Sequence, residues 1–443
     1  MAPAPCNAGL PALLRRGTLY DYPVDLDAKL AILADAAKYD ASCASSGSKG
    51  RGSDASTGKG FGSTEGMGIC HSYTPDGRCV SLLKVLLTNA CRYDCQYCIN
   101  RVSSDVQRTR FSVDELVMVF IAFYKRNYVE GLFLSSGIPK SPDDTMEEML
   151  RVVRSLREEH HFHGYIHIKA VPGASQRLLD ECGRLVDRIS ANIELPTEPD
   201  LKQLAPDKSL PIIESTMTQL ATGIDDAKQV AKETKQRPLY APAGQSTQLI
   251  VGATPTTDQG ILTTSTRLYA QHGLRRVYYS AYSPIQAPDA RLPPSPPDLL
   301  REHRLYQADW LLRFYGFSVD EIAPLEAPTL SRDVDPKLAW ALRHRGLFPL
   351  DVNVATMELL LRVPGFGTKN VDRLIVSRRH RRLRLEDLKR LRVNLKKAQP
   401  FIVTADHNPA TKQLDTVTLP QRFVRPAQLT LFDASREALS GQL

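Results

Sequence analysis

Apolar runs alternate with amphipathic segments from Val80 onward, a pattern that predicts parallel strands joined by helices. The predicted strands are Ser81–Leu87, Gly131–Leu134, Tyr165–Ala170, Arg188–Ile193, Thr247–Val251 and Arg276–Ser280. The predicted helices centre on Met146–Leu156, Gln176–Val186, Ile213–Lys232 and Gly260–Tyr269. Strands and helices in this order predict an α/β fold, a partial (β/α)6 barrel of the TIM type whose ligands bind at the carboxyl ends of the strands. A doubly wound open sheet is the alternative.

The helix that follows the first strand has a defined start. Ser112 and Glu115 form a capping box, in which each side chain accepts a hydrogen bond from the backbone of the other. Apolar residues then recur on one helical face. We therefore expect a helix that begins at Ser112 and packs against the sheet.

Composition divides the remaining chain. Residues 1–79 are predicted to hold an N-terminal helix and a cysteine-containing loop, because 41–68 is rich in Gly and Ser. The barrel is expected at 80–285. A linker and helical connection at 286–330 begins with a proline-rich stretch and includes an amphipathic helix over 298–314. A small all-α domain at 331–404 and a C-terminal extension at 405–443 complete the prediction.

The overall composition is that of a soluble globular protein, with 42% hydrophobic and 24% charged residues among 443. The chain does not open with a secretory signal and has no apolar stretch of membrane-spanning length, so we expect it in the cytoplasm. In that compartment eight cysteines favour metal or redox chemistry over disulfides. The net charge of +8 includes a dense basic run at 378–384, which permits contact with a polyanion.

The first predicted strand leads directly into three cysteines spaced Cys-x3-Cys-x2-Cys. Cys91, Cys95 and Cys98 are close enough in sequence to hold one iron–sulfur cube, and three ligands leave one iron open to chelate a small molecule. A zinc site is the alternative. Zinc sites usually have two or four cysteine ligands, and the sequence near these three cysteines offers no fourth ligand.

With the aromatic Tyr97 just before its third cysteine, this loop resembles that of the radical S-adenosylmethionine (SAM) superfamily. The resemblance implies a [4Fe-4S] cluster on Cys91, Cys95 and Cys98 whose open iron binds the amino and carboxylate groups of SAM. An electron from a low-potential donor such as flavodoxin or ferredoxin would cleave SAM, and the resulting 5′-deoxyadenosyl radical would abstract hydrogen from the substrate.

The resemblance also implies cofactor contacts after the second strand. Family members usually carry a Gly-Gly-Glu-like turn there, and the matching residues are Ser135, Ser136 and Gly137, without the acidic residue. We expect carbonyl and hydroxyl oxygens of this turn to accept hydrogen bonds from the amino group of SAM. Ordinary turn residues are the alternative.

Further cofactor contacts are expected after the fourth and fifth strands. Ser190, Asn192 and Glu194 alternate on one face and could reach the ribose or carboxylate of SAM. Gly252 and Thr254 match loosely the segment that contacts adenine in the family. Ordinary strand ends are again the alternative.

Three more cysteines precede the barrel. Cys43, Cys70 and Cys79 could hold a second iron–sulfur cluster or a zinc ion, with His71 as a fourth ligand, and so stabilise a polar segment. Their spacing fits no ligand template. Unrelated thiols are the alternative.

The segment Met357–Ile375 resembles a helix–hairpin–helix motif. Its turn is Pro364, Gly365, Phe366 and Gly367, where glycines let the backbone approach a phosphate, and Thr368 is expected to cap the second helix. Phe366 is expected to plug the hairpin. Further phosphate contacts are expected from nearby cations, namely Lys369, Arg379, Arg381 and Arg382. A hairpin used for protein packing is the alternative.

The chain as a whole, from Tyr39-Asp-Ala-Ser-Cys43 through the cysteine loop to this hairpin, resembles a radical SAM family named for DNA modification or repair. Its members are associated with uracil-DNA-glycosylase-like proteins, so the resemblance implies DNA and such a protein as partners. It implies an enzyme that modifies or repairs a DNA base, which would leave the stack to reach a buried radical. An RNA- or tRNA-modifying radical enzyme and a non-catalytic iron–sulfur DNA-binding sensor of damage or redox state are the alternatives.

Overall fold

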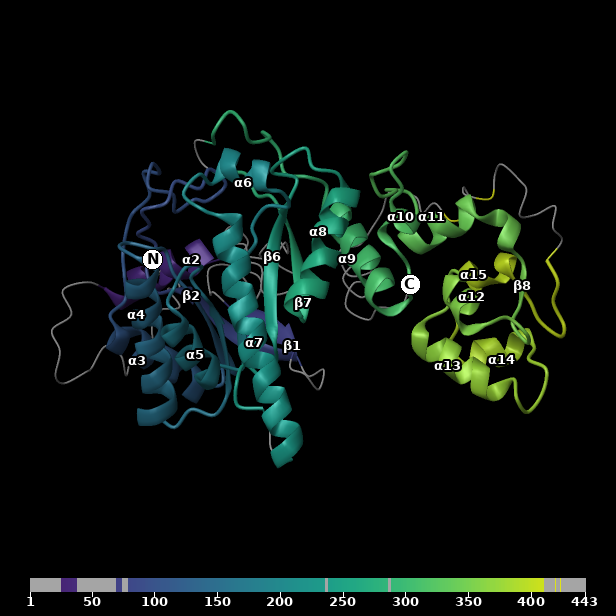
Figure 1. The fold of residues 1–443 in the computed structure, drawn as a ribbon, viewed down its shortest axis with the longest axis horizontal. Coiled ribbons are helices and arrows are strands. Elements are labelled where there is room, and N and C mark those ends of the chain that lie inside the picture. The colour runs from purple at the N-terminus through teal and green to yellow at the C-terminus, as the bar shows by residue number, and fades with distance from the viewer. Residues whose placement is uncertain are drawn as a thin grey trace, which may run out of the picture. The chain divides into compact units, whose positions relative to one another are not determined.

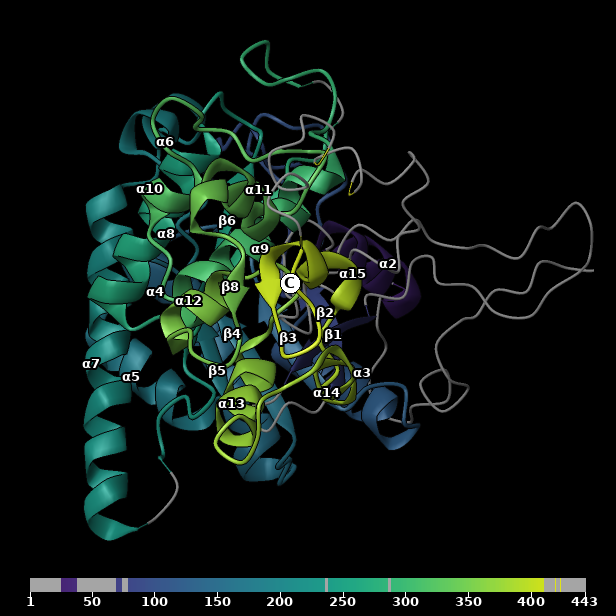
Figure 2. The same ribbon diagram turned by 90° about the vertical axis from the view of Figure 1, so that its right-hand side faces the viewer.

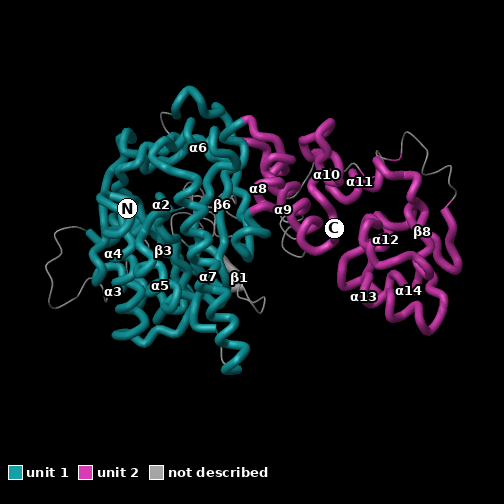
Figure 3. Tube along the Cα trace, viewed as in Figure 1, with its two compact units in different colours: residues 1–254, 268–296 teal, residues 255–267, 297–443 magenta. Residues whose placement is uncertain are grey.

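The computed structural model describes residues 25–37, 69–73, 79–235, 238–285 and 288–409, with Leu419 and Phe423. They fall into two compact units (Figure 3). The first comprises Met1–Thr254 and Leu268–Pro296, and the second comprises Pro255–Arg267 and Pro297–Leu443. Residues 255–267, which the sequence analysis placed in the barrel, therefore belong to the second unit.

The first unit is built on a seven-stranded sheet with the strands in sequence order. The strands are β1 (Ile69–Tyr73), β2 (Cys79–Leu86), β3 (Gly131–Ser135), β4 (Tyr165–Lys169), β5 (Arg188–Ser190), β6 (Gln245–Val251) and β7 (Arg276–Ala281). β2 to β7 are parallel and curl into a half-barrel (Figures 1 and 2). The predicted six-stranded partial barrel is thus confirmed, with each strand near its predicted position.

One strand of this sheet was not predicted. β1 runs antiparallel to β2, with Cys70 opposite Leu82 and Tyr73 opposite Cys79. Its sequence, Ile-Cys-His-Ser-Tyr, lies in the segment assigned to a loop because that segment lacks a sustained apolar pattern. Pairing with an already apolar neighbour, β2, provides the stability that the pattern of β1 alone does not indicate.

Helices connect the parallel strands and pack against one another in succession, α3 with α4, α4 with α5 and α5 with α7. They are α3 (Val113–Lys125), α4 (Pro142–Arg154), the π-helical turn η1 (Ser155–Glu159), α5 (Gln176–Leu185), α6 (Glu198–Leu204) and α7 (Leu210–Thr234), preceded by α2 (Leu26–Ala37). The capping box at Ser112 and Glu115 is confirmed, since both of its hydrogen bonds form. α2 packs on β2, and Lys29 of α2 pairs with Glu115 at 2.8 Å.

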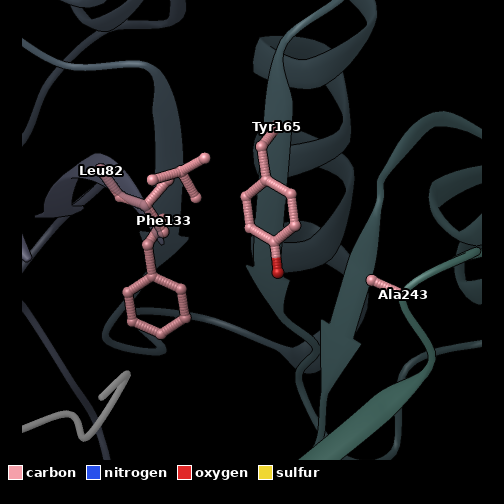
Figure 4. Packing of buried hydrophobic residues seen from close by; sticks show 5 residues of the cluster. Leu82, Phe133, Tyr165 and Ala243 are labelled. Carbon is pink, nitrogen blue, oxygen red and sulfur yellow. The ribbon is translucent and has the colours of Figure 1, made fainter. Parts of the chain in front are cut away.

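The two faces of the curved sheet differ in chemistry. Apolar residues such as Leu83, Leu134 and Ile166 are buried on the face toward the helices, where Gln245 also donates to the carbonyl of Met217 in α7. The alternate residues lie on the interior face. Near the start of the strands they form an apolar base of Val80, Leu82, Phe133, Tyr165 and Ala243 (Figure 4). Above this base the interior face becomes polar.

The second unit is mainly helical. Its elements are α9 (Leu299–Phe314), α10 (Val319–Ile322), α11 (Pro336–Arg343), η2 (Arg345–Leu347), β8 (Leu350–Asp351), α12 (Met357–Arg362), α13 (Thr368–Ser377), α14 (Leu385–Arg390), α15 (Leu395–Ala398), η3 (Gln399–Phe401) and β9 (Ile402–Val403), and α8 (Asp258–His272) begins within it. The prediction of an all-α domain was wrong in one detail, because β8 and β9 pair in parallel. Strands this short leave no periodic signal in a sequence.

In the described part of the chain, none of the helices combines the length and apolar character needed to cross a membrane. The prediction of a cytoplasmic location stays a prediction.

Candidate active site

The cysteine loop leaves the carboxyl end of β2, and a single guanidinium group holds its two ends together. Arg108 donates from Nη1 to the carbonyl oxygens of Asn89 and Asn100, at 2.6 and 2.9 Å. Its Nη2 donates to the carbonyl oxygens of Arg101 and Ser104, at 2.6 and 3.0 Å. Arg108 therefore bridges the residues that precede Cys91 and those that follow Cys98. Hydrogen bonds to a charged donor are stronger than those between neutral groups, so this is a firm clamp.

Long-range backbone contacts fix the loop against the rest of the sheet. The amide of Arg92 donates to the carbonyl of Ile138 at 2.8 Å, and that of Gln96 to the carbonyl of Leu204 at 2.7 Å. The amide of Asp94 donates to the carboxylate of Asp207 at 2.8 Å. The loop is thus held by segments that follow β3 and β5, which end at the same edge of the sheet as β2.

The three cysteine thiols of this loop are free and lie mostly inside the protein. Cys95 is buried, and Cys91 and Cys98 are half-buried. Burial raises the pKa of the Cys98 thiol to about 12, although the amide of Asn100 donates to its Sγ at 3.4 Å. Burial also raises the pKa of Cys95. A thiolate at these positions therefore needs an electrophilic partner such as a metal, since the protein alone favours the thiol.

No three His, Cys, Asp or Glu side chains among the described residues converge on a position for a single metal ion. Thiolates that share a four-iron cluster each bind a different iron, so they require no such common point. Three thiols on one loop, with backbone amides nearby, fit the cysteine ligation of such a cluster.

A buried ionic group lies beside the cysteines. Lys208 Nζ is 3.0 Å from Glu194 Oε1 and 3.3 Å from the Tyr97 hydroxyl. Lys169 approaches the same carboxylate oxygen at 3.4 Å. Burial opposes the charge of Lys208, but the carboxylate of Glu194 raises its pKa, so the lysine keeps its positive charge next to the cysteines. Positive charge here favours an anionic thiolate cluster.

This ionic group changes the interpretation of Glu194. The sequence analysis expected its carboxylate to reach SAM, but in the structure Glu194 binds two lysines, Lys169 and Lys208. Its φ angle of 66° lies in the left-handed region, a strained backbone that these contacts help to hold. Any role of Glu194 in cofactor binding remains a prediction. Lys169 and Lys208, which bind its carboxylate, were not identified from the sequence.

The turn Ser135–Gly137 packs against the cysteine loop. The amide of Gly137 donates to the carbonyl of Thr88 at 2.7 Å. A Cβ atom on Gly137 would collide with the carbonyl oxygen of Ala90, so glycine is required by this close approach. The hydroxyl of Ser136 donates to the carbonyl of Gly137, and Ser135 is buried. The turn thus lies where the resemblance expects it, and its contact with SAM stays a prediction.

The remaining predicted cofactor residues lie at the same edge or below it. Ser190 contacts the imidazole of His167 at 3.0 Å, and the amide of Asn192 donates to the side chain of Gln248 at 3.1 Å. Gly252, which follows β6, has a φ of 81°. Thr254 is half-buried at the end of the same turn. Their contacts with SAM are likewise untested.

The N-terminal cysteines can be followed only in part, because Cys43 lies outside the described residues. Cys79 begins β2. Cys70 packs against the apolar base formed by residues such as Leu82 and Tyr165. A second cluster or zinc ion on these cysteines is therefore not supported by the described residues and stays a prediction.

The second unit contains the predicted hairpin, formed by α12, the turn and α13. Phe366 is fully buried, which confirms that it plugs the hairpin. One expectation was wrong: α13 starts at Thr368 with Gly367 as its N-cap, so the hydroxyl of Thr368 does not cap the helix. Helix starts are uncertain by a residue or two from sequence. The turn residues 364–367 are buried, whereas Lys369 is exposed.

A second hairpin, which sequence analysis missed, covers this turn. α14 and α15 are joined by a turn in which Arg392 has a φ of 61°, matching the φ of 83° at Gly365. Asn394 donates its backbone amide to the carbonyl of Gly365, and Asn370 donates to the carbonyl of Arg392. The signal that could have found it is the repeated order of helix, tight turn and helix. It escaped notice because arginine occupies the position that glycine fills in the first hairpin.

The basic residues near these hairpins differ in their surroundings. Arg381 pairs with Asp387, and Arg382 lies 3.5 Å from Asp351. These two arginines are exposed, as are Lys369 and Arg379. All four were predicted to contact nucleic acid. The acidic partners compete with phosphate for Arg381 and Arg382.

Residues 85–215 match the family model described as the radical SAM superfamily, so this part of the chain is a radical SAM domain. The match contains the cysteine loop, the Ser135–Gly137 turn and the ionic group around Glu194 and Lys208. The domain implies a [4Fe-4S] cluster and SAM as its cofactors. No curated protein matches the chain.

Several solved structures resemble the chain at low identity. The FeFe-hydrogenase maturase HydG from Carboxydothermus hydrogenoformans is 13% identical with a TM-score of 0.36, covering 50% of this chain and 48% of its own. Methylornithine synthase (PylB) is 13% identical with a TM-score of 0.38, covering 52% and 60%. The radical SAM methyltransferase TsrM from Kitasatospora setae is 10% identical with a TM-score of 0.31, covering 44% and 36%. The matches therefore span roughly half of this chain and of most of these proteins.

Proposed function

We propose that this protein is a radical SAM enzyme that modifies or repairs a base in DNA. The radical SAM domain supports an enzymatic role. The observation that carries the proposal is the cysteine loop at the carboxyl edge of the half-barrel, clamped by Arg108 and flanked by a buried Lys208. When bound, the reduced cluster and SAM together supply a radical that abstracts hydrogen.

The chain's own residues prepare this edge for that chemistry. Cys91, Cys95 and Cys98 would hold the cluster, and Arg108 fixes the backbone on which they lie. Lys208 offsets the negative charge of the thiolates. Because these groups are mostly buried, the loop also limits the access of water.

The support for DNA as substrate comes from the second unit. Two hairpins that pack turn to turn resemble a motif used for sequence-independent contact with a duplex, and exposed cations adjoin them. Such contacts position a nucleic acid without reading its bases. The target base would then have to leave the stack to meet a buried radical.

The experiment that tests this proposal is anaerobic incubation of the reconstituted, reduced protein with SAM and duplex DNA. Damaged and undamaged duplexes would be digested afterwards, and their nucleosides and the cofactor products measured by mass spectrometry. We expect a changed nucleoside in one DNA sample only when SAM and reductant are both present. Unchanged nucleosides in all DNA samples, with SAM cleaved, would contradict the DNA assignment but leave the radical chemistry standing.

The same experiment separates the alternatives. A changed nucleoside in tRNA or other RNA, and none in DNA, would identify an RNA-modifying enzyme. Tight DNA binding without any SAM cleavage would identify an iron–sulfur sensor. A flavodoxin or ferredoxin as electron donor, and a uracil-DNA-glycosylase-like protein as partner, belong to the same proposal and can be tested by adding each to the incubation.

A further inference from the structure

The interior face of the half-barrel carries an unusual row of polar side chains, which meets the apolar base at Phe133. TIM-type barrels are generally filled by layers of bulky apolar side chains. In this protein the register instead sets Lys84, Phe133, His167 and Arg188 side by side on β2, β3, β4 and β5. Three of these side chains are in contact: Lys84 lies over the ring of Phe133, whose centroid is 4.4 Å from that of His167.

The charges on this face are mostly positive. By alternation, the interior positions of β2 to β7 include the cations Lys84, Lys169, Arg188 and Arg276. At the upper edge, Lys169 pairs with the carboxylate of Glu194, which also binds Lys208. Arg188 therefore lies on a face with several cations at its strand positions.

Arg188 has a donor without a partner. It is only 6% exposed, its Nη1 donates to the hydroxyl of Tyr278 at 3.2 Å, and its Nε has no hydrogen-bond partner. A buried guanidinium with an unsatisfied N–H group is costly, and such a cost favours a ligand that supplies an acceptor.

A second unsatisfied group lies close to Arg188. Ser246 is 0% exposed, and its Oγ has no hydrogen-bond partner. It pairs in register with Ser190 of β5, two residues after Arg188. Because residues two apart on a strand share a face, the hydroxyls of Ser190 and Ser246 and the guanidinium of Arg188 face the same side of the sheet.

We propose that Arg188, Ser190, Ser246 and Tyr278 form a site on the interior face of the half-barrel that binds a phosphate group. The available donors are the N–H groups of Arg188 and the hydroxyls of Ser246 and Tyr278, whereas the hydroxyl of Ser190 already contacts His167. Phosphate presents more acceptors than a carboxylate and takes the fork of an arginine well. Arg276 adds charge, since it lies over the ring of Tyr278 at 5.5 Å.

The site goes beyond the proposed function, because it does not depend on DNA as the substrate. It lies below the edge where the cysteine loop leaves β2: Arg188 and Ser190 precede Asn192 and Glu194 along the same segment. The phosphate could belong to a mononucleotide or to a nucleic-acid chain. Both sources share the chemistry that the site recognises, and competition distinguishes them.

The test is isothermal titration of the full-length, cluster-loaded protein with inorganic phosphate under anaerobic conditions. Ser246→Ala removes a donor that has no partner in the protein, so the fold should be retained, and the phosphate affinity should fall about twofold to tenfold. Arg188→Met should reduce it by about tenfold to a hundredfold. Arg184→Met, which removes an exposed cation from the nearby helix α5, is the matched control and should bind like the parent protein.

Two results would overturn the proposal: phosphate affinity unchanged in both Ser246→Ala and Arg188→Met, or acetate binding as tightly as phosphate. Should Arg188→Met fail to fold, Ser246→Ala alone decides. Competition by a deoxynucleoside 5′-monophosphate, but not by the matching deoxynucleoside, would support the site and assign a mononucleotide phosphate. Competition by duplex DNA, but not by the mononucleotide, would support the site and assign its phosphate to a nucleic-acid backbone. SAM cleavage and DNA binding by the parent protein are measured in separate experiments. A protein that does neither would contradict the proposed function but would not change the result of the phosphate titration.

Discussion

At the scale of single residues, the cysteine loop depends on charged groups that are distant in sequence. The spacing of Cys91, Cys95 and Cys98 was enough to predict a cluster site, because cluster ligation leaves a local pattern. The roles of Arg108 and Lys208 could not be predicted in this way. One donates to carbonyls that any residue type would offer, and the other meets Glu194 only after the chain has folded.

The first prediction concerns Arg108. Replacing it with Gln removes four hydrogen bonds from a charged donor to loop carbonyls, so the loop should lose its fixed shape. We expect the iron bound per chain after anaerobic reconstitution to fall by half or more, with far-ultraviolet circular dichroism unchanged. Arg110→Gln, which breaks an exposed pair with Glu148, is the control and should keep its iron. Equal iron content in both variants would contradict the clamp.

The second prediction concerns the charge of Lys208. Loss of a positive charge beside an anionic cluster makes its reduction harder, so Lys208→Met should lower the midpoint potential. A shift on the order of 100 mV is expected for an effective dielectric constant of about 20. Lys208→Arg keeps the charge and should shift the potential less. Redox titration followed by electron paramagnetic resonance measures both, and identical potentials in the two variants would show that the charge does not act on the cluster.

At the scale of elements, periodic patterns predicted the six parallel strands and their helices. The other strands form because of the partners with which they pair. β1 forms because β2 offers it an edge, and β8 and β9 are too short to carry a pattern. Neither the hydrophobic periodicity nor a glycine in the turn predicted the second hairpin. Its turn places a left-handed Arg392 where the first hairpin has Gly365, so the turn chemistry that usually marks such a motif is absent.

The third prediction tests the packing of the two hairpins. Gly365→Ala would place a Cβ atom 2.6 Å from the carbonyl oxygen of Asn394 at a φ of 83°, so the second unit should lose stability, by about 1–3 kcal/mol. Gly346→Ala is the control, because its Cβ would meet no atom within 4 Å. Thermal or urea unfolding of the two variants measures the difference. A Gly365→Ala protein as stable as the Gly346→Ala protein would contradict the packed arrangement.

At the scale of the whole molecule, the proposed function assigns a different task to each unit. The radical SAM domain lies within the first unit, and the paired hairpins lie within the second. If the tasks are separate, changes to the exposed cations of the second unit should alter DNA binding and leave SAM cleavage in the absence of DNA unaltered. This division was predictable in outline, because the proline-rich segment after 285 and the change in composition mark a boundary.

The fourth prediction follows from that division. Lys369→Gln combined with Arg379→Gln should weaken binding to duplexes of any sequence and reduce the salt slope by about 2, since each lost phosphate contact contributes about 1. The matched pair is Arg381→Gln with Arg382→Gln, which should reduce the slope less, because Asp387 and Asp351 already pair with those arginines. Fluorescence anisotropy across a salt series measures both slopes. Slopes equal to that of the parent protein in both variants would mean that the hairpins serve protein packing.

Formation of 5′-deoxyadenosine shows whether the three cysteines hold a cluster that cleaves SAM. The parent protein and the Cys91→Ala, Cys95→Ala, Cys98→Ala triple variant would be reconstituted with iron and sulfide, reduced with dithionite and incubated with SAM, and 5′-deoxyadenosine would be quantified by chromatography. We expect 5′-deoxyadenosine from the parent protein and none above background from the triple variant. Equal amounts from both proteins, or none from a parent protein that has bound its iron, would contradict this expectation.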